Sequence, residues 1–240
     1  MSNRRTVLVT GASRGIGAAV VETFLEHGYQ VAANSLTFSR GEFTDGPNLA
    51  LVEGDIGLQD TAERLIATAM SRFGSIDHVI NNAGIFVAKS FTDYSVHDLA
   101  RLMAANLNSF VFVTQSAVRQ MLLQSTGGSV TAITAALASN PMVGVPASIA
   151  MMTKGALNAL TLSLANEYAA RGIRFNAVAP GVVDTPMHAA GDKDNLKKLT
   201  PMGVISEAKD IADAVLYLTE ARFVTGEVLH VDGGAHNGRW

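Results

Sequence analysis

A glycine-rich turn after the first apolar run is the feature that most restricts how this 240-residue chain can fold. The run Val7-Leu8-Val9 predicts a short buried strand, and it leads into Thr10-Gly11-Ala12-Ser13-Arg14-Gly15-Ile16-Gly17. Gly11 permits a tight turn, Gly15 lets the backbone approach a pyrophosphate, and Gly17 lets the next helix pack closely on the strand. This succession of strand, turn and helix is typical of a dinucleotide-binding unit, in which the helix N-terminus attracts phosphate.

Short β-rich runs alternate with longer helical patterns, which predicts parallel strands joined by right-handed crossovers. The predicted strands are residues 7–10, 30–34, 49–53, 78–81, 129–134, 174–178 and 227–231. The predicted helices are residues 15–27, 59–72, 96–124, 149–170 and 207–218, with Gly28, Gly74 and Gly172 at helix C-termini. Residues 36–48 predict a loop where a crossover helix would normally lie. No repeat or linker divides the chain. We therefore expect an α/β fold with one Rossmann-type doubly wound domain over residues 1–240, about seven parallel strands and helices on both faces.

Composition narrows the possible partners. The net charge of −3 and the lack of a basic run argue against nucleic acid. No apolar stretch approaches the length of a membrane span, and the N-terminal residues lack the pattern of a secretory signal. The chain has no cysteine, which excludes disulfides, thiolate metal ligands and a cysteine nucleophile. We expect a cytoplasmic protein that binds a small molecule and no metal.

Further motifs follow the glycine-rich turn in a fixed order. They are Asp55-Ile56 after the third strand, Asn81-Asn82-Ala83-Gly84 after the fourth, Asn106 on the long helix, Lys154-Gly155-Ala156-Leu157, Pro180-Gly181-Val182-Val183-Asp184-Thr185, and residues 223–234 at the last strand. This set resembles the short-chain dehydrogenase/reductase family over nearly the whole chain, in the style of 3-oxoacyl-carrier-protein reductases and their relatives. The resemblance implies hydride transfer between a nicotinamide and a small carbonyl or alcohol substrate.

The resemblance also implies which residues meet the cofactor and the reacting groups. The expected cofactor-binding residues are Gly11, Ser13, Arg14, Gly15, Ile16, Gly17, Asn34, Ser35, Asp55, Ile56, Asn82, Ala83, Gly84, Lys154, Pro180, Gly181, Val183 and Thr185. Asn106 and Lys154 match two positions of the family's catalytic set.

The end of the second strand bears on the choice between NAD and NADP. An acidic residue there would hydrogen-bond the ribose 2′-hydroxyl of NAD, but this chain has Asn34 and Ser35. Arg14, in the glycine-rich turn, can pair with a 2′-phosphate, and Arg40 can add a second guanidinium; the alternative is that both arginines are merely solvated. NADP is the expected cofactor, with NAD as the alternative.

Two catalytic positions of the family lack a hydroxyl here. Ala150 stands four residues before Lys154, where the family carries its tyrosine. The position of the family's serine falls on Leu137 by counting or on Ala135 by matching the strand. The tyrosines of the chain, Tyr29, Tyr94, Tyr168 and Tyr217, all lie far away in sequence.

Several groups could replace the missing phenol. His188 lies on the loop that covers substrate in relatives and could donate a proton near neutral pH, or it could be solvated. Lys154 could act as the acid if burial lowers its pKa, or it could only bind ribose. The remaining hydroxyls have simpler alternatives: Ser148 as a helix N-cap, Thr134 and Ser139 as strand or loop hydroxyls, and Thr153 on another helix face. Asp184, near His188, is expected to face solvent.

Three functions remain open. The first is an NADP(H)-dependent oxidoreductase with an atypical proton donor. The second is a non-catalytic NADP-binding protein, a sensor or an assembly partner. The third, ranked below both, is a non-redox enzyme that binds the nucleotide. We also expect a homo-oligomer, a tetramer or a dimer, since Leu102, Phe110, Leu157 and Leu164 could face either the sheet or a partner. The substrate pocket is expected from residues 85–94, 137–146 and 187–199, whose apolar content suggests an uncharged, partly apolar compound.

Overall fold

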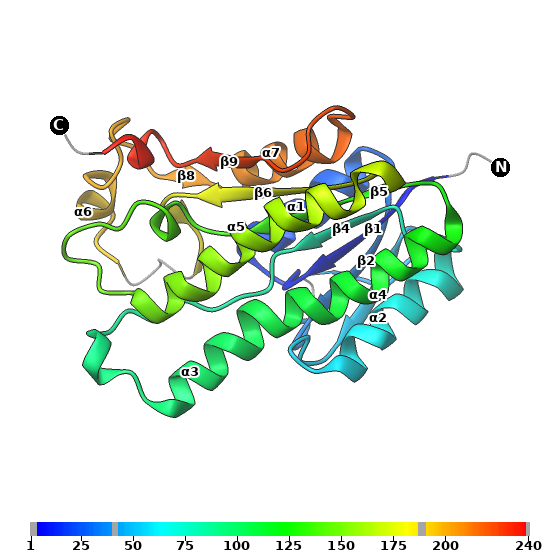
Figure 1. Ribbon diagram of the computed structural model, residues 1–240, viewed down its shortest axis with the longest axis horizontal. Coiled ribbons are helices and arrows are strands. Elements are labelled where there is room, and N and C mark those ends of the chain that lie inside the picture. Colours follow the sequence, from blue (N-terminus) through cyan, green and yellow to red (C-terminus); the bar gives the residue numbers. More distant parts are fainter. Residues whose placement is uncertain (1–3, 40–42, 187–190, 239–240) are drawn as a thin grey trace.

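The computed structural model describes residues 4–39, 43–186 and 191–238. A seven-stranded parallel sheet forms its centre (Figure 1). The strand order is β3 (Leu49–Glu53), β2 (Gln30–Ser35), β1 (Thr6–Thr10), β4 (His78–Asn81), β5 (Gly128–Ile133), β6 (Ile173–Pro180) and β9 (Val228–Val231). The order reverses between β1 and β4, and this is where open α/β sheets bind their ligands. The expected α/β fold with helices on both faces is confirmed.

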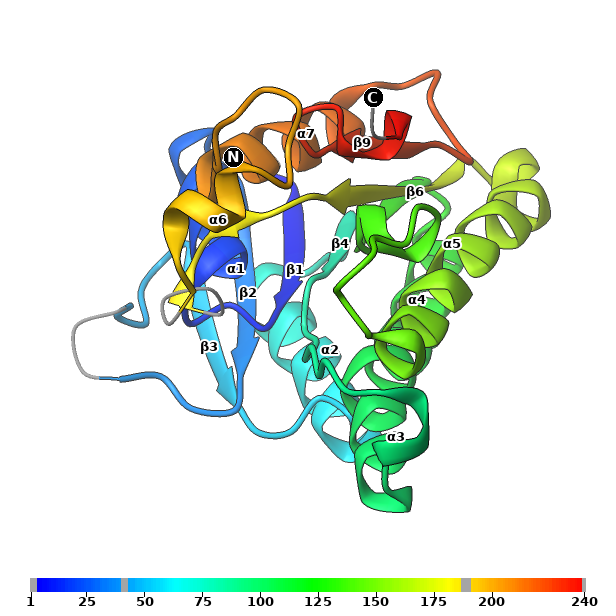
Figure 2. The same cartoon turned by 90° about the vertical axis from the view of Figure 1, so that its left-hand side faces the viewer.

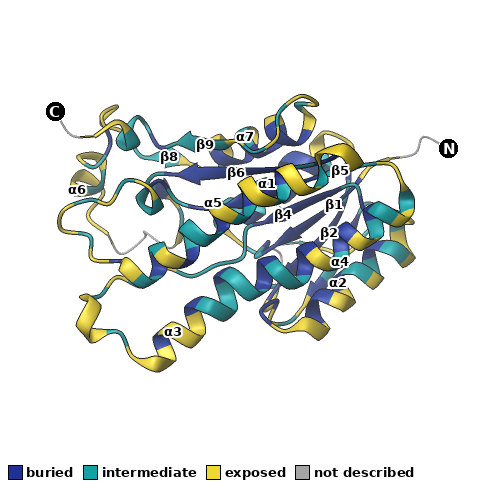
Figure 3. Ribbon diagram, viewed as in Figure 1, coloured by how far each residue is buried: buried dark blue, intermediate teal, exposed yellow. Residues whose placement is uncertain are grey.

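Helices cover the two faces of the sheet in separate groups. On one face lie α2 (Gln59–Phe73), α4 (Ser109–Gln124) and α5 (Ser148–Tyr168), and on the other lie α1 (Gly15–Glu26) and α7 (Ala208–Glu220) (Figure 1). Side chains of β1 alternate between them: Leu8 joins the apolar cluster under α2, α4 and α5, whereas Val7 and Val9 join the cluster under α1 and α7. The central strands are accordingly buried on both sides, whereas the edge strand β9 is only partly buried (Figure 3). None of the described helices has the length and hydropathy to cross a bilayer.

The remaining elements are short and lie at the ends of the sheet. They are the 3-10 turns η1 (Phe91–Asp93), η3 (Ala136–Ala138), η4 (Ala169–Arg171) and η6 (Ala235–Asn237), the helix α6 (Lys193–Lys197), and the strands β7 (Val183–Asp184) and β8 (Ser206–Glu207), which pair with each other. The sequence did not predict β7 and β8, which are too short to give a pattern. The described parts of residues 36–48 contain no helix, as expected.

The prediction of one continuous helix over residues 96–124 is wrong for the middle of this segment. The structure has α3 (Val96–Leu102), a π-helical turn η2 (Met103–Asn108) and then α4. Asn106 lies in this π-helical turn and is 1% exposed. A π-helical turn holds one more residue than an α-helical turn and often marks a functional position.

The helix residues considered for a partner interface face the protein itself. Leu102, Phe110 and Leu157 are all buried, and Leu164 packs against the apolar cluster under α2, α4 and α5. An interface on α5 would therefore use other residues of that helix, such as Met152 and Leu162, which are exposed.

Candidate active site

The glycine-rich turn has the geometry expected of a phosphate-binding loop. Gly11 and Gly15 adopt left-handed backbone angles, with φ of 65° and 56°. A Cβ atom on Gly17 would lie 2.1 Å from the Gly11 carbonyl oxygen, so only glycine fits there. Helix α1 begins at Gly15, and no side chain caps its N-terminus. Its first N–H groups are thus left to meet a ligand, which fits a pyrophosphate at this cradle.

A second turn, after β4, holds the glycine-rich turn in place. The Asn82 amide donates to the carbonyl oxygens of Thr10 and Gly11 at 3.0 and 2.9 Å, and the Ala83 N–H donates to the Thr10 hydroxyl at 3.0 Å. A Cβ on Gly11 would lie 2.8 Å from the Ala83 Cα. Asn82 therefore shapes the cradle through the backbone of the neighbouring turn.

The end of β2 carries uncharged polar groups. The Asn34 amide nitrogen donates to the carbonyl oxygens of Val52 and Gly54 at 2.9 and 3.1 Å, and the buried Asn34 Oδ1 has no partner among the described atoms. The Ser35 hydroxyl donates to the Ser13 hydroxyl at 2.8 Å and ties β2 to the glycine-rich turn. The amide of Asn34 is thus used within the protein, and the carboxylate that NAD would favour is absent here.

Arg14 and the residues after β3 complete the nucleotide end. Arg14 is exposed directly before α1, and its guanidinium makes no hydrogen bond or ion pair with the described residues. Asp55 is exposed, and its Oδ1 accepts the Gly57 N–H at 2.8 Å. Ile56 is buried in the apolar cluster under α2, α4 and α5, so its side chain serves packing. Arg40 lies outside the described residues.

Lys154, Asn106 and Gly84 come together beside the end of β5. A Cβ built on Gly84 would lie 3.0 Å from Asn106 Oδ1 and 3.2 Å from Lys154 Nζ. The Lys154 amine donates to the Ile133 carbonyl at 2.7 Å, and burial lowers the pKa of Lys154 to about 8. Desolvation of the ammonium is the cause of this shift. The structure therefore unites the two catalytic-set residues that the sequence retains.

Hydrogen bonds fix the orientation of Asn106. Its Oδ1 accepts the Ile85 N–H at 2.7 Å, and its amide nitrogen donates to the Ile85 carbonyl at 3.1 Å and to the Thr153 hydroxyl at 2.9 Å. The Thr153 hydroxyl in turn donates to the Ala150 carbonyl at 2.7 Å. Thr153 thus links the π-helical turn to the first turn of α5 and does not face an open site.

The position of the missing tyrosine is apolar and closed. Ala150 is 1% exposed and forms a small cluster with Leu102 and Ala147. The apolar side chains packed against this cluster are Ile85, Val87, Tyr94, Val145, Ile149 and Met151. Tyr94 therefore packs against the cluster that contains Ala150, although it is distant in sequence. Its hydroxyl donates to the Val87 carbonyl at 2.6 Å.

The other hydroxyls considered as replacements have structural partners or lie on the surface. Thr134 is buried and its hydroxyl donates to the Val178 carbonyl at 3.2 Å. Ser139 accepts from the Asn158 amide at 3.5 Å. Helix α5 begins at Ser148, one residue before the expected start, and its N-cap is Ala147. The prediction of Ser148 as the N-cap is therefore wrong, and its side chain is exposed.

The segment after β6 approaches the glycine-rich turn. A Cβ on Gly15 would lie 3.3 Å from Thr185, so the glycine-rich turn faces the last of the expected cofactor residues. Pro180 ends β6, the Gly181 N–H donates to the Val231 carbonyl at 3.0 Å, and Val183 is buried under α1 and α7. Ile16 packs against the same cluster.

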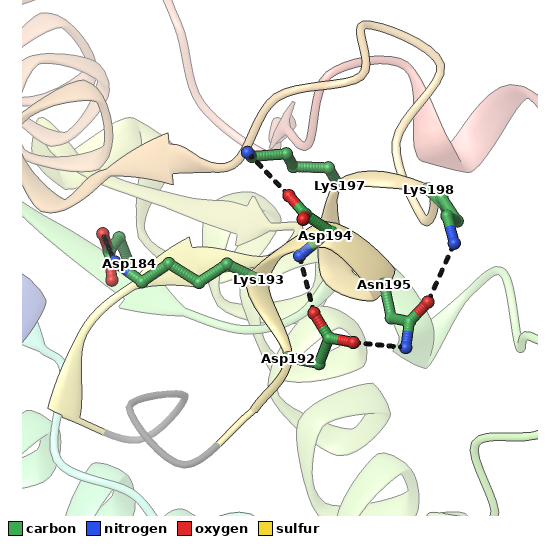
Figure 4. A network of polar contacts seen from close by, with 7 residues as sticks. All are labelled: Asp184, Asp192, Lys193, Asp194, Asn195, Lys197 and Lys198. Atoms are coloured by element: carbon green, nitrogen blue, oxygen red, sulfur yellow. Dashed lines mark hydrogen bonds and ion pairs between the residues drawn. The ribbon is translucent and has the colours of Figure 1, made fainter.

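Beyond this segment a polar network surrounds α6 (Figure 4). Asp184 is exposed, as expected, and pairs with Lys193 at 2.7 Å; Asp192 caps α6 by accepting the Asp194 N–H at 3.0 Å. The neighbouring His188 lies outside the described residues, so its part in proton transfer stays a prediction.

The sequence interpretation missed a histidine pair at the C-terminal end. Asp232 is buried, and its carboxylate oxygens lie 3.0 Å from His236 Nδ1, while the His236 ring stacks on His230 with ring centroids 4.2 Å apart. Asp232 also packs against Gly181, and η6 lies against η3 (Figure 1). The spacing of Asp232 and His236 after the last strand was the available signal. Within the described residues, no group of three His, Asp or Glu side chains could hold a metal ion.

Comparisons with known proteins agree with this architecture. A family model described as Enoyl-(Acyl carrier protein) reductase matches residues 11–236. The chain is 36% identical over 254 residues to a 3alpha-hydroxysteroid dehydrogenase of Mediterraneibacter gnavus, with 99% of both chains covered. Among solved structures, the ligand-free aldohexose dehydrogenase of Thermoplasma acidophilum has 30% identity and a TM-score of 0.89, covering 98% of this chain and 95% of that one. ElxO with NADP bound has 27% identity and a TM-score of 0.88, covering 98% of this chain and 100% of that one.

The matched region contains the glycine-rich turn, Asn82-Ala83-Gly84, Asn106, Lys154 and Pro180-Gly181, in the order and spacing noted in the sequence. The chain therefore belongs to the short-chain dehydrogenase/reductase family of NAD(P)-dependent oxidoreductases.

Proposed function

We propose that this protein is an NADP(H)-dependent oxidoreductase for a small carbonyl or alcohol substrate, with a proton donor other than tyrosine. The observation that carries the proposal is the cluster of Lys154, Asn106 and Gly84 at the carboxyl end of β5, next to the glycine cradle. A bound nicotinamide would supply or accept the hydride. The protein's own residues would bind the nucleotide, hold the substrate and exclude water.

NADP is the proposed cofactor because of the charges around its expected adenosine end. Arg14 is exposed at the start of α1, and β2 itself ends without a carboxylate. The carboxylate next to it, that of Glu53 on β3, accepts the Phe38 N–H at 2.8 Å. The neighbouring Ser13 and Ser35 hydroxyls, 2.8 Å apart, add uncharged hydrogen-bonding groups. The ElxO structure, solved with NADP bound, lends support by similarity.

Proton transfer is proposed to use Lys154, His188 or water. Lys154 Nζ would lie 3.2 Å from a Cβ on Gly84, and an ammonium with a pKa of about 8 gives up its proton far more easily than an exposed lysine. General acid catalysis contributes about 10²–10⁴-fold, whereas orientation of the reactants can contribute more, so turnover without the phenol is physically reasonable.

A non-catalytic NADP-binding protein is the second candidate. The observation that favours it is the burial of Ala150 in an apolar cluster, which leaves no polar group where relatives carry the tyrosine. An intact nucleotide end combined with a closed, apolar reaction end is the arrangement that a cofactor sensor would have.

The two candidates are distinguished by following NADPH absorbance with a panel of ketones and aldehydes, and NADP⁺ reduction with the matching alcohols. We expect stoichiometric conversion of at least one compound. Tight NADPH binding by calorimetry, together with no turnover across the panel, would favour the non-catalytic protein.

A further inference from the structure

A recess with a volume of about 250 Å³ lies between the end of β5 and the start of α5. Its wall includes Leu137, Val145, Pro146, Ala147 and Met151. Leu137 follows Ala135 by two residues, and Met151 directly follows Ala150. The recess therefore borders both positions where relatives carry catalytic hydroxyls, and it belongs to the reaction end of the site.

The chemistry of the wall is almost entirely apolar. Ser148 carries the only side-chain hydroxyl among the lining residues, and it is exposed. Val145, Ala147 and Met151 continue from the recess into the closed cluster around Ala150. The polar groups nearby are already paired, since the hydroxyls of Tyr94 and Thr153 donate to backbone carbonyls.

This wall discriminates between the two kinds of compound named for the relatives. A sugar carries a hydroxyl on nearly every carbon, and each hydroxyl that enters an apolar recess loses its hydrogen bonds to water without replacement. An apolar ring gains free energy by leaving water for the same surface. The free space of about 250 Å³ is enough for one or two small rings, so the polarity of the wall and not its size separates the two kinds of compound.

We propose that the recess binds the apolar ring of a ketone or alcohol substrate, so that the protein acts on apolar cyclic compounds and not on sugars. This inference rests on the proposed function for the reaction, but the binding of the ring can be tested without turnover. In the reduction, the carbonyl carbon accepts a hydride from NADPH, the carbon–oxygen π bond opens, and the oxygen takes a proton from Lys154, His188 or water.

The test uses decalone, a bicyclic ketone, and D-glucose as probes. Binding is measured by saturation-transfer NMR and calorimetry with NADP⁺ present, and turnover is measured with NADPH for decalone and with NADP⁺ for glucose. We expect decalone to bind and glucose to give no signal.

Two substitutions replace apolar side chains in the wall of the recess by polar side chains of nearly the same size and shape. Val145→Thr combined with Met151→Gln should weaken decalone binding about tenfold or more, because buried polar atoms would face the ring. NADP⁺ affinity should stay unchanged. Val96→Thr is the matched control, since Val96 begins α3, lies outside the expected substrate pocket and is 85% exposed; it should bind decalone like the wild type.

The outcomes separate the inference from the function on which it rests. Glucose bound or turned over in preference to decalone, no decalone binding, or unchanged decalone binding in the double variant would each overturn the inference. Decalone binding that responds to the double variant, without any NADPH oxidation, would support the recess and contradict the proposed oxidoreductase activity.

Discussion

Acid should destabilise this protein through one buried histidine on β4. His78 is 4% exposed; its Nδ1 lies 2.8 Å from the Ser129 hydroxyl, and its Nε2 is buried without a partner among the described atoms. Burial, with smaller contributions from the charges of Arg5 and Arg174, lowers the pKa of His78 from 6.5 to about 3. The native state therefore holds this imidazole neutral.

The direction in which stability changes with pH follows from which state of the protein binds the proton more readily. Below pH 6.5 the unfolded chain takes up a proton at His78, whereas the folded protein does so only near pH 3, so stability is present above pH 6.5 and is lost as the pH falls. This difference between the folded and unfolded pKa corresponds to about 5 kcal/mol of the free energy of unfolding. About 2 kcal/mol of it is lost between pH 7 and pH 5.

The assay is urea unfolding at pH 7, 6 and 5, with His78→Asn as the reference, since asparagine can keep a hydrogen bond to Ser129. The wild type should lose about 2 kcal/mol more than the variant over this range, because the carboxylates common to both proteins cancel. NMR of the His78 ring gives a second measurement on the wild type alone, and should show a neutral imidazole down to pH 5. Parallel stability curves, or a ring that titrates near pH 6.5 in the folded protein, would refute the argument.

Three further predictions concern the site and the assembly. Arg14→Ala should reduce the preference for NADPH over NADH by about tenfold, because a charge-assisted contact to the 2′-phosphate is lost; calorimetry with both cofactors checks this, and an equal loss for both would contradict it. Ala150→Tyr should lower the free energy of unfolding by about 1–3 kcal/mol, because Ala150 is 1% exposed and the ring must displace its apolar neighbours; a rise in Tm with a gain in turnover would show that the cluster has room for a phenol. The protein should be a tetramer with Met152 and Leu162 of α5 at an interface; light scattering at micromolar concentration should give about four chain masses, and the mass of one chain would contradict this.

The sheet was predictable from the sequence because its strands are buried on both sides. A strand such as β3 has apolar side chains on both faces and turn residues at its ends, so its bounds match the expected residues 49–53. Likewise, Gly28, Gly74 and Gly172 take the left-handed backbone angles expected where helices end.

The parts that were missed depend on contacts between distant segments. The π-helical turn around Asn106 has no local signature, since Met103, Ala104, Ala105 and Leu107 are good α-helix formers. The hydrogen bonds between Asn106 and Ile85, and from Asn106 to Thr153, form only once α5 and the turn after β4 are in place. The closed cluster at Ala150 and the stacking of His236 on His230 similarly join segments that one sequence leaves unrelated. The glycine-rich turn, in contrast, is local in sequence, and its tight geometry could be predicted for that reason.

The π-helical turn between α3 and α4 holds one residue more than a continuous α-helix would need. Removing a single residue, for example Ala104 or Ala105, would let Met103–Asn108 relax into an ordinary α-helix. The helices on either side would keep nearly the same phase, because the π-helical turn already absorbs the extra residue. Leu102 should therefore stay in the cluster that it shares with Ala150, and Asp98 should keep its 2.7 Å ion pair with Lys89. The side chain of Asn106 should instead turn away from Ile85 and Thr153, to which it is now hydrogen-bonded. A one-residue shortening should thus spare the fold and change the reaction end of the molecule.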